Sequence, residues 1–157
     1  MKITLLLVGK TDDSTIGQLV DDYTKRLSHY VSFNHQVLPD LKKTKHLTQE
    51  QQKQQEGNLL MAQIAPADYV ILLDEKGKQY SSIRFSEFIQ KQLNSGVKHV
   101  VFVVGGPYGF SDLIYERSNA LLSLSPMTFS HQMVRLFFTE QLYRAFTILK
   151  GEPYHHQ

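Results

Sequence analysis

Five short apolar runs, separated by amphipathic or polar stretches, set the pattern of this chain. They cover residues 3–8, 33–38, 69–73, 100–104 and 121–124. Most of them are almost wholly apolar, which is typical of strands covered on both faces in a parallel sheet. The run at 33–38 alternates loosely, and we expect that strand nearer an edge of the sheet.

Between these runs, apolar positions recur at helical spacing. Residues 13–30 and 84–93 each carry such a stripe. Thr48 and Gln51 resemble a capping box that begins a helix, and Ala65-Pro66 ends that helix after residue 64. Ser111 is placed to cap a short helix after the fourth run. Strands alternating with helices predict one α/β domain over residues 1–157, with a mostly parallel sheet and helices on both faces.

The last predicted helix, residues 132–149, is apolar around most of its circumference. One face of a sheet cannot bury all of those side chains. A second copy of the chain is the economical partner, so we expect a homodimer through this C-terminal helix. The apolar positions are Met133, Val134, Leu136, Phe137, Phe138, Leu142, Tyr143, Ala145, Phe146, Ile148 and Leu149.

Length and composition exclude several classes of protein. The 157 residues, 41% of them apolar and 20% charged, suit one domain with a core rather than a disordered or membrane chain. There is no cysteine, so any metal would need His and carboxylate ligands, and we expect none. Residues 1–9 are too short for a signal peptide and lack a cleavage site, so the expected location is the cytoplasm.

Charge is weak overall but locally concentrated. The net charge of +2 does not by itself indicate a nucleic-acid-binding protein. Lys42, Lys43 and Lys45, together with His46, form a compact basic segment that is either solvated surface or a contact for an anion. Further basic groups, including Arg135 and Arg144, enrich the last fifth of the chain.

Two turn-rich loops follow the fourth and fifth runs. They are Gly105-Gly106-Pro107-Tyr108-Gly109 and Ser125-Pro126-Met127-Thr128-Phe129. Glycine exposes its main chain to a ligand, and ligands of parallel sheets bind beyond the carboxyl ends of the strands. The strand ends at residues 73–74, 105–106 and 124–125 are therefore expected to line one site. The glycine loop is neither a dinucleotide fingerprint nor a P-loop, and a purely structural turn is the alternative.

Four segments, taken together, carry a family resemblance. They are residues 74–78 (DEKGK), 103–109 (VVGGPYG), 124–135 (LSPMTFSHQMVR) and 140–145 (EQLYRA), with a closing Tyr154-His155. The chain resembles, from Lys2 to the C-terminus and at matching length, the RlmH family of ribosomal large-subunit methyltransferases of the SPOUT class. Tyr108 stands where relatives commonly have acidic or polar residues. Ser130 replaces a frequent proline, which we expect to loosen the start of the last helix.

The resemblance implies a fold, a reaction and a cofactor. The fold is a SPOUT domain with a C-terminal trefoil knot. The reaction is methylation of N3 of a pseudouridine in 23S rRNA, on the assembled ribosome, by a homodimer that uses S-adenosylmethionine. The cofactor-binding positions that it implies are Leu73, Gly105, Gly106, Leu124, Ser125, Pro126, Met127, Thr128 and Phe129.

The chemistry of the implied reaction and the local charge of the chain suggest candidate catalytic and RNA-binding groups. The N3 proton must leave, so a nearby base or stabilising cation would help, and His131, Arg135 and His155 are the candidates. For His131 a structural role is the alternative, and for His155 a role in substrate binding. RNA contacts are expected from a set of basic and tail residues, so that ribosome shape, not free rRNA, is recognised. That set is Lys42, Lys43, Lys45, Arg144, Tyr154 and His155.

Two other functions remain open at this point. One is a non-enzymatic module, ribosome-associated or adenine-nucleotide-binding, that uses the same loops. The other is a tRNA ribose methyltransferase on the same fold, although the Asn and Arg arrangement usual for that group is missing near residues 9–14.

Overall fold

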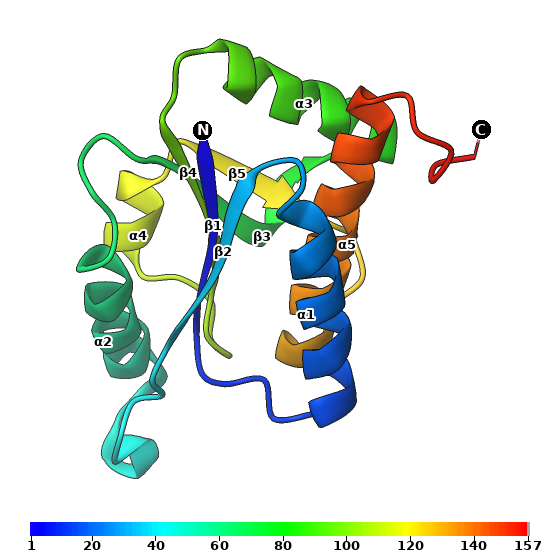
Figure 1. Ribbon diagram of the computed structural model, residues 1–157. Coiled ribbons are helices and arrows are strands. Elements are labelled where there is room, and N and C mark those ends of the chain that lie inside the picture. The colour runs from blue at the N-terminus through cyan, green and yellow to red at the C-terminus, as the bar shows by residue number, and fades with distance from the viewer. Residues whose placement is uncertain (157) are drawn as a thin grey trace.

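The computed structural model describes residues 1–156 as a five-stranded parallel sheet with helices on both faces (Figure 1). This confirms the predicted α/β class. In chain order the elements are β1 (Lys2–Val8), α1 (Ser14–Leu27), β2 (Ser32–Leu38), the 3-10 helix η1 (Thr44–His46), α2 (Gln49–Met61), β3 (Tyr69–Gln79), α3 (Ser82–Asn94), β4 (His99–Val104), α4 (Asp112–Arg117), β5 (Ala120–Ser123) and α5 (His131–Leu149).

The strand order is β2-β1-β4-β3-β5, and every pairing is parallel. β2 lies at an edge, as its looser alternation predicts. β1 is central, and its residue Leu5 pairs with His35 of β2 on one side and with Phe102 of β4 on the other. All five carboxyl ends therefore point toward the same edge of the sheet.

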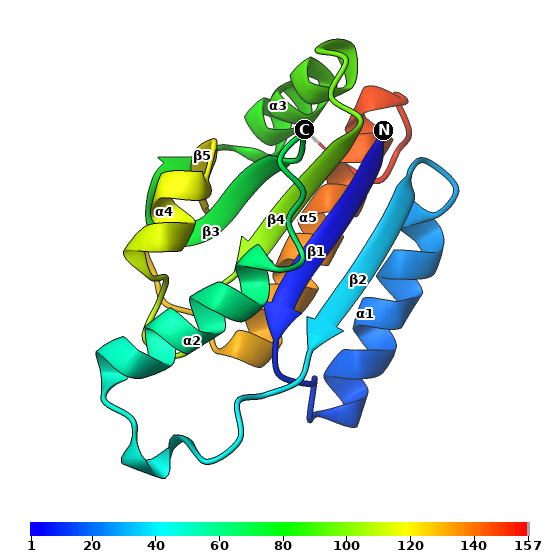
Figure 2. The same ribbon diagram turned by 90° about the vertical axis from the view of Figure 1, so that its left-hand side faces the viewer.

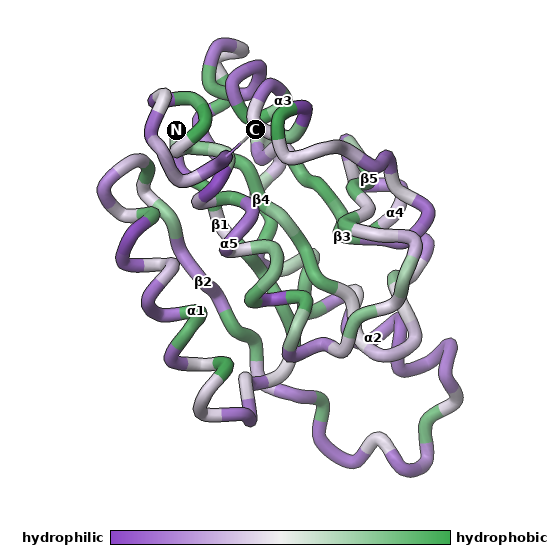
Figure 3. The backbone as a smooth tube through the Cα atoms, turned by 90° about the vertical axis from the view of Figure 1, so that its right-hand side faces the viewer, coloured by the Kyte–Doolittle hydropathy of each residue, from purple (hydrophilic) through white to green (hydrophobic). Residues whose placement is uncertain are grey.

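Each face of the sheet has its own hydrophobic core. On one face, Leu5 and Phe102 pack with α1, α3 and α5, and the rings of Phe102 and Phe138 lie 4.6 Å apart between centroids. On the other face, Leu6 and Val103 pack with α2 and α4. Figure 2 shows these two helical layers on opposite sides of the strands, and Figure 3 shows that the central strands consist mainly of hydrophobic residues while α1 mixes hydrophobic and hydrophilic ones. Among the described helices, none combines the length and apolar character needed to cross a bilayer.

β3 is longer than its apolar run. The sequence predicts a strand that ends before Asp74, but the strand continues to Gln79 through polar residues. It pairs with β5 twice, with a register shift between Leu73 and Lys78. Gly77 permits the close approach, because a Cβ there would lie 2.5 Å from backbone atoms of Leu122. Hydrophobic periodicity does not predict this extension, because the contacts that stabilise the extension are main-chain contacts with β5, a strand distant in the sequence.

α5 lies between α1 and α3 on one face of the sheet (Figure 1). Its inward residues, among them Phe138 and Leu142, are fully buried. Its outer side keeps a strip of apolar side chains, in which Phe137 is 39% exposed and Val134 and Ile148 are half-buried. One chain thus covers most, but not all, of this helix.

Candidate active site

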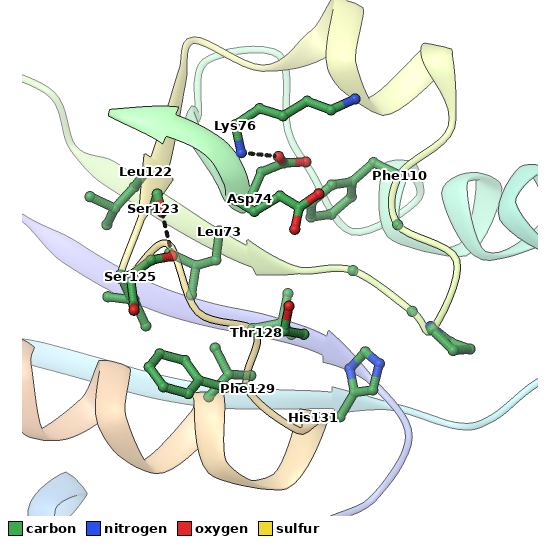
Figure 4. Close-up of a pocket in the computed structure, with 18 of the residues that line it drawn as sticks. Leu73, Asp74, Lys76, Phe110, Leu122, Ser123, Ser125, Thr128, Phe129 and His131 are labelled. Carbon is green, nitrogen blue, oxygen red and sulfur yellow. Dashed lines mark hydrogen bonds between the residues drawn. The ribbon is translucent and has the colours of Figure 1, made fainter. Parts of the chain in front are cut away.

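A cavity of about 440 Å³ lies at the carboxyl ends of β4 and β5 and beside residues 73–76 of β3. Three segments surround it: the irregular part of β3 that begins at Leu73, the glycine loop after Val104 and the turn after Leu124 (Figure 4). All of the cofactor-binding residues expected from the resemblance line this cavity except Pro126, which is exposed beside it. The fold therefore brings together two strand ends and the middle of β3, which lie far apart in the sequence.

Short polar side chains hold the turns in shape. Ser125 Oγ accepts a hydrogen bond from the Met127 amide at 2.9 Å, and Ser123 Oγ donates to the Ser125 carbonyl at 3.0 Å. In the glycine loop, the Gly109 amide donates to the Gly106 carbonyl at 3.1 Å, and Gly109 has a φ of 82°. Serine favours such tight turns because its hydroxyl forms hydrogen bonds with nearby main-chain groups, and glycine favours them because it adopts positive φ without strain.

Asp74 lines the cavity, and two hydrogen bonds orient its carboxylate. Asp74 Oδ1 accepts from the Lys76 amide at 2.8 Å, and Asp74 Oδ2 accepts from the Tyr115 hydroxyl. Burial, followed by that bond to Asp74, raises the pKa of Tyr115, so the phenol stays a neutral donor. Tyr115 is not among the residues that the sequence predicts at the site. The contact joins residues 41 positions apart, and no local pattern signals it.

His131, the first residue of α5, lines the cavity. Burial, followed by the positive charge of Arg135, lowers its pKa, while Glu56 raises it by a smaller amount. The imidazole is therefore neutral near pH 7 and has a nitrogen able to accept a proton. The loosening expected at Ser130 is wrong: Ser130 caps α5, and its Oγ accepts a hydrogen bond from the Met133 amide at 3.2 Å.

Arg135, expected from the sequence as a catalytic candidate, is not among the residues that line the cavity. Its side chain is 2% exposed and turns inward, where Nη1 donates to Thr11 Oγ1 at 2.9 Å and Nη2 to the Val8 carbonyl at 3.3 Å. It thus links α5 to the end of β1. Arg135 acts on the cavity through its charge, which lowers the pKa of His131, and not through direct contact.

The C-terminal tail lies at the other end of α5. The Tyr154 hydroxyl donates a hydrogen bond to Glu140 at 3.0 Å, so it accepts the one that joins it to the Tyr23 hydroxyl at 3.1 Å. Arg144 Nη1 lies 3.3 Å from His155 Nδ1. Arg144 lies 13 positions after His131 in α5, a distance of about 20 Å at 1.5 Å per residue. Figure 1 shows the C-terminal tail at the end of α5 opposite the helix start, so within one chain the tail lies far from His131, the first residue of α5.

The basic segment with Lys42, Lys43 and Lys45 is exposed. It follows the carboxyl end of β2, so it leaves the same edge of the sheet at which the cavity opens. Lys43, the residue before η1, has a left-handed backbone conformation with a φ of 59°. In the described part of the chain, no three His, Asp or Glu side chains gather as metal ligands.

Comparison with known proteins shows the family to which this chain belongs. A family described as "Predicted SPOUT methyltransferase" matches residues 1–155. Ribosomal RNA large subunit methyltransferase H of Christiangramia forsetii is 58% identical, and that of Porphyromonas gingivalis is 55% identical, each over the full length of both chains. The chain therefore belongs to the SPOUT methyltransferase family and, within it, to the ribosomal RNA large subunit methyltransferase H group.

A solved structure gives independent support for the fold alone. It is that of a probable methylase family protein from Haemophilus influenzae Rd KW20, with a TM-score of 0.53 at 9% identity. The match covers 95% of this chain and 66% of the other, so this chain spans about two thirds of that protein's length.

Proposed function

We propose that this protein uses S-adenosylmethionine to methylate N3 of a pseudouridine in 23S rRNA, acting in the cytoplasm on the assembled ribosome. The single observation that carries the proposal is the convergence of three segments, the irregular part of β3 from Leu73 and the loops after β4 and β5, on one cavity. The full-length similarity to proteins named for ribosomal RNA large subunit methylation supports the substrate class.

The cavity suits the proposed cofactor in size and chemistry. Its volume is in the range of small-molecule sites, and its lining combines apolar walls with exposed main chain. Leu73, Leu124 and Phe129 would form the walls around a flat adenine. Gly105 would let the ligand approach the backbone because it has no side chain. The space beside it is too small for one, since a Cβ there would lie 3.2 Å from the Phe110 ring. The remaining binding contacts would come from Gly106, Ser125, Met127 and Thr128, with Pro126 shaping the turn.

When bound, S-adenosylmethionine supplies a methyl group made electrophilic by its sulfonium. The protein's own contribution is positioning and proton transfer. In this proposal, neutral His131 accepts the N3 proton of the substrate base, and buried Arg135 keeps the imidazole neutral between turnovers. The competing interpretation of His131 as a structural residue predicts no change in the pH dependence of the rate when it is replaced.

We further propose that the active form is a homodimer through α5. The apolar strip containing Phe137 and Val134 gives the contact surface. In one chain the tail groups Arg144, Tyr154 and His155 are distant from His131, so they would act from a second copy, on the substrate RNA. Lys42, Lys43 and Lys45 would add contacts to RNA at the carboxyl edge. The trefoil knot is part of this proposal and would hold the three segments around the cavity together without a lid.

The deciding experiment is methylation of ribosomes from a strain that lacks the enzyme, with labelled cofactor, followed by mass spectrometry of nucleosides. We expect N3-methylated pseudouridine, formed on ribosomes and poorly on naked 23S rRNA fragments. A different methylated nucleoside, such as a 2′-O-methylated one in tRNA, would exclude the proposal.

The non-enzymatic alternative is tested by thermal stabilisation with three ligands. The proposal predicts that S-adenosylmethionine and its demethylated product stabilise the protein. Stabilisation by ATP alone would favour an adenine-nucleotide-binding module.

A further inference from the structure

Glu56, on α2, is a buried acid outside the cavity lining. Only 5% of it is exposed, although it lies in a glutamine-rich helix with a largely polar surface. Its Oε1 accepts a hydrogen bond from Gln52 Nε2 at 3.0 Å, and its Oε2 has no hydrogen-bond partner within residues 1–156. A buried carboxylate without a bonded cation costs stability, and such groups concentrate at functional sites.

The carboxylate lies directly behind the glycine loop. A Cβ on Gly106 would be 1.9 Å from Glu56 Oε2 and 2.6 Å from its Cδ, so the carboxyl group is in contact with the main chain of this residue. Gly106 itself lines the cavity. Glycine at 57 allows α2 to come this close, since a Cβ there would be 2.2 Å from Ser111 Oγ. Only one residue of backbone therefore separates Glu56 from the ligand space.

The negative charge of Glu56 affects a residue that lines the cavity. It raises the pKa of His131, a lining residue, against the effects of burial and of Arg135. Burial makes this charge act over a longer range than an exposed carboxylate would, because water screens it less. Of the other charged groups near the cavity, Asp74, Glu75 and Lys76 line it from β3, and buried Arg135 is bonded to the end of β1.

We propose that Glu56 determines specificity for the methylated, cationic form of the cofactor. This inference rests on the function proposed above. S-adenosylmethionine and its product S-adenosylhomocysteine share the adenosine, amino and carboxylate groups, and they differ in one methyl group and in the positive charge on sulfur. A fixed negative charge behind the glycine loop attracts the sulfonium and loses that attraction once the methyl group has left. The site then releases its product and accepts a new donor.

The test compares the affinities of both ligands in matched variants. Glu56→Gln keeps the size of the side chain and removes its charge. The control is Glu50→Gln, on the same helix, where the carboxylate is exposed and pairs with Lys53. By calorimetry, Glu56→Gln should weaken S-adenosylmethionine binding about tenfold and change S-adenosylhomocysteine binding by less than about twofold. Glu50→Gln should change neither.

Two outcomes would overturn the assignment: an equal loss of affinity for both ligands, which would make Glu56 a structural support of the loop, or no loss for either. A second measurement needs no variant. In the wild-type protein sinefungin, whose amine replaces the sulfonium with another cation, should bind more tightly than S-adenosylhomocysteine, and equal binding would contradict the proposal. If the wild-type protein binds none of the three ligands, the proposed function itself fails.

Discussion

Arg135 Nη1 and Thr11 Oγ1, 124 positions apart in the chain, are joined by a hydrogen bond of 2.9 Å. The bond ties the first turns of α5 to the segment that follows β1. The guanidinium is buried and bonded to a carbonyl and a hydroxyl, and within residues 1–156 it has no carboxylate partner. A residue expected as a catalytic cation thus also links two distant segments, and its charge lowers the pKa of His131.

Replacing Arg135 tests this role. Arg135→Gln should lower the free energy of unfolding by about 2 kcal/mol, because buried acceptors lose their donors. Thr11→Val, which removes one bond, should lower it by about 1 kcal/mol. Urea unfolding followed by circular dichroism measures both. Full stability of Arg135→Gln combined with lost methylation would restore a direct role in the reaction.

Gly105→Val should abolish cofactor binding and leave the fold largely intact. The branched side chain would enter the cavity wall, where even a Cβ would lie 3.2 Å from the Phe110 ring. Calorimetry with S-adenosylmethionine measures the effect. Gly17→Ala is a suitable control because its nearest neighbour, Thr11 Cγ2, is 3.9 Å from the added atom. Wild-type affinity in Gly105→Val would remove the glycine loop from the site.

His131 should control the acid side of the rate profile. Its pKa lies below its ordinary value of about 6.5 because of burial and Arg135, so its base form persists below neutrality. We expect the methylation rate to fall only below about pH 6.5, and His131→Gln to reduce the rate about 100-fold. Rates measured between pH 5 and 8 on ribosomes test both. A wild-type rate and profile in the variant would leave His131 a purely structural role.

His35 should make the protein sensitive to acid. Burial, followed by the charge of Arg135, lowers the pKa of His35, and its Nε2 is buried without a hydrogen-bond partner in the described chain. The unfolded state therefore binds more protons, so this contribution to stability is complete above about pH 6.5 and is lost as the pH falls toward the folded pKa. His35→Leu should give a shallower loss of unfolding free energy between pH 7 and 5. Exposed His46→Gln should leave the slope unchanged.

Phe137 should control assembly. Its ring is 39% exposed on the outer strip of α5 and lies 4.9 Å from that of Phe129, which lines the cavity. Phe137→Glu should convert a dimer to a monomer in light scattering and lower cofactor affinity through Phe129. Leu113→Glu places the same charge on α4, at a similarly exposed position on the opposite face of the sheet. A monomeric wild-type protein at micromolar concentration would contradict the dimer.

The fold class and the location of the cavity could be predicted from the sequence because both depend on local patterns. Buried strands such as β1 and β4 are continuous apolar runs, and parallel strands place their following turns at one edge. The glycine loop and the turn at residues 125–129 are recognisable as loops from their glycine, proline and serine content. Their convergence with Leu73 follows from the strand order, which the alternation of elements restricts but does not specify.

Other features depended on tertiary structure, and they share one physical reason. The inward direction of Arg135, the burial of Glu56 behind Gly106 and the extension of β3 past Asp74 all arise from contacts between distant segments. Polar residues carry no periodic signal that separates a solvated side chain from a buried one, since both have the same local sequence. Apolar periodicity therefore determined which segments are buried, while the packing of α2 and α5 against the strand ends decided where their charges act.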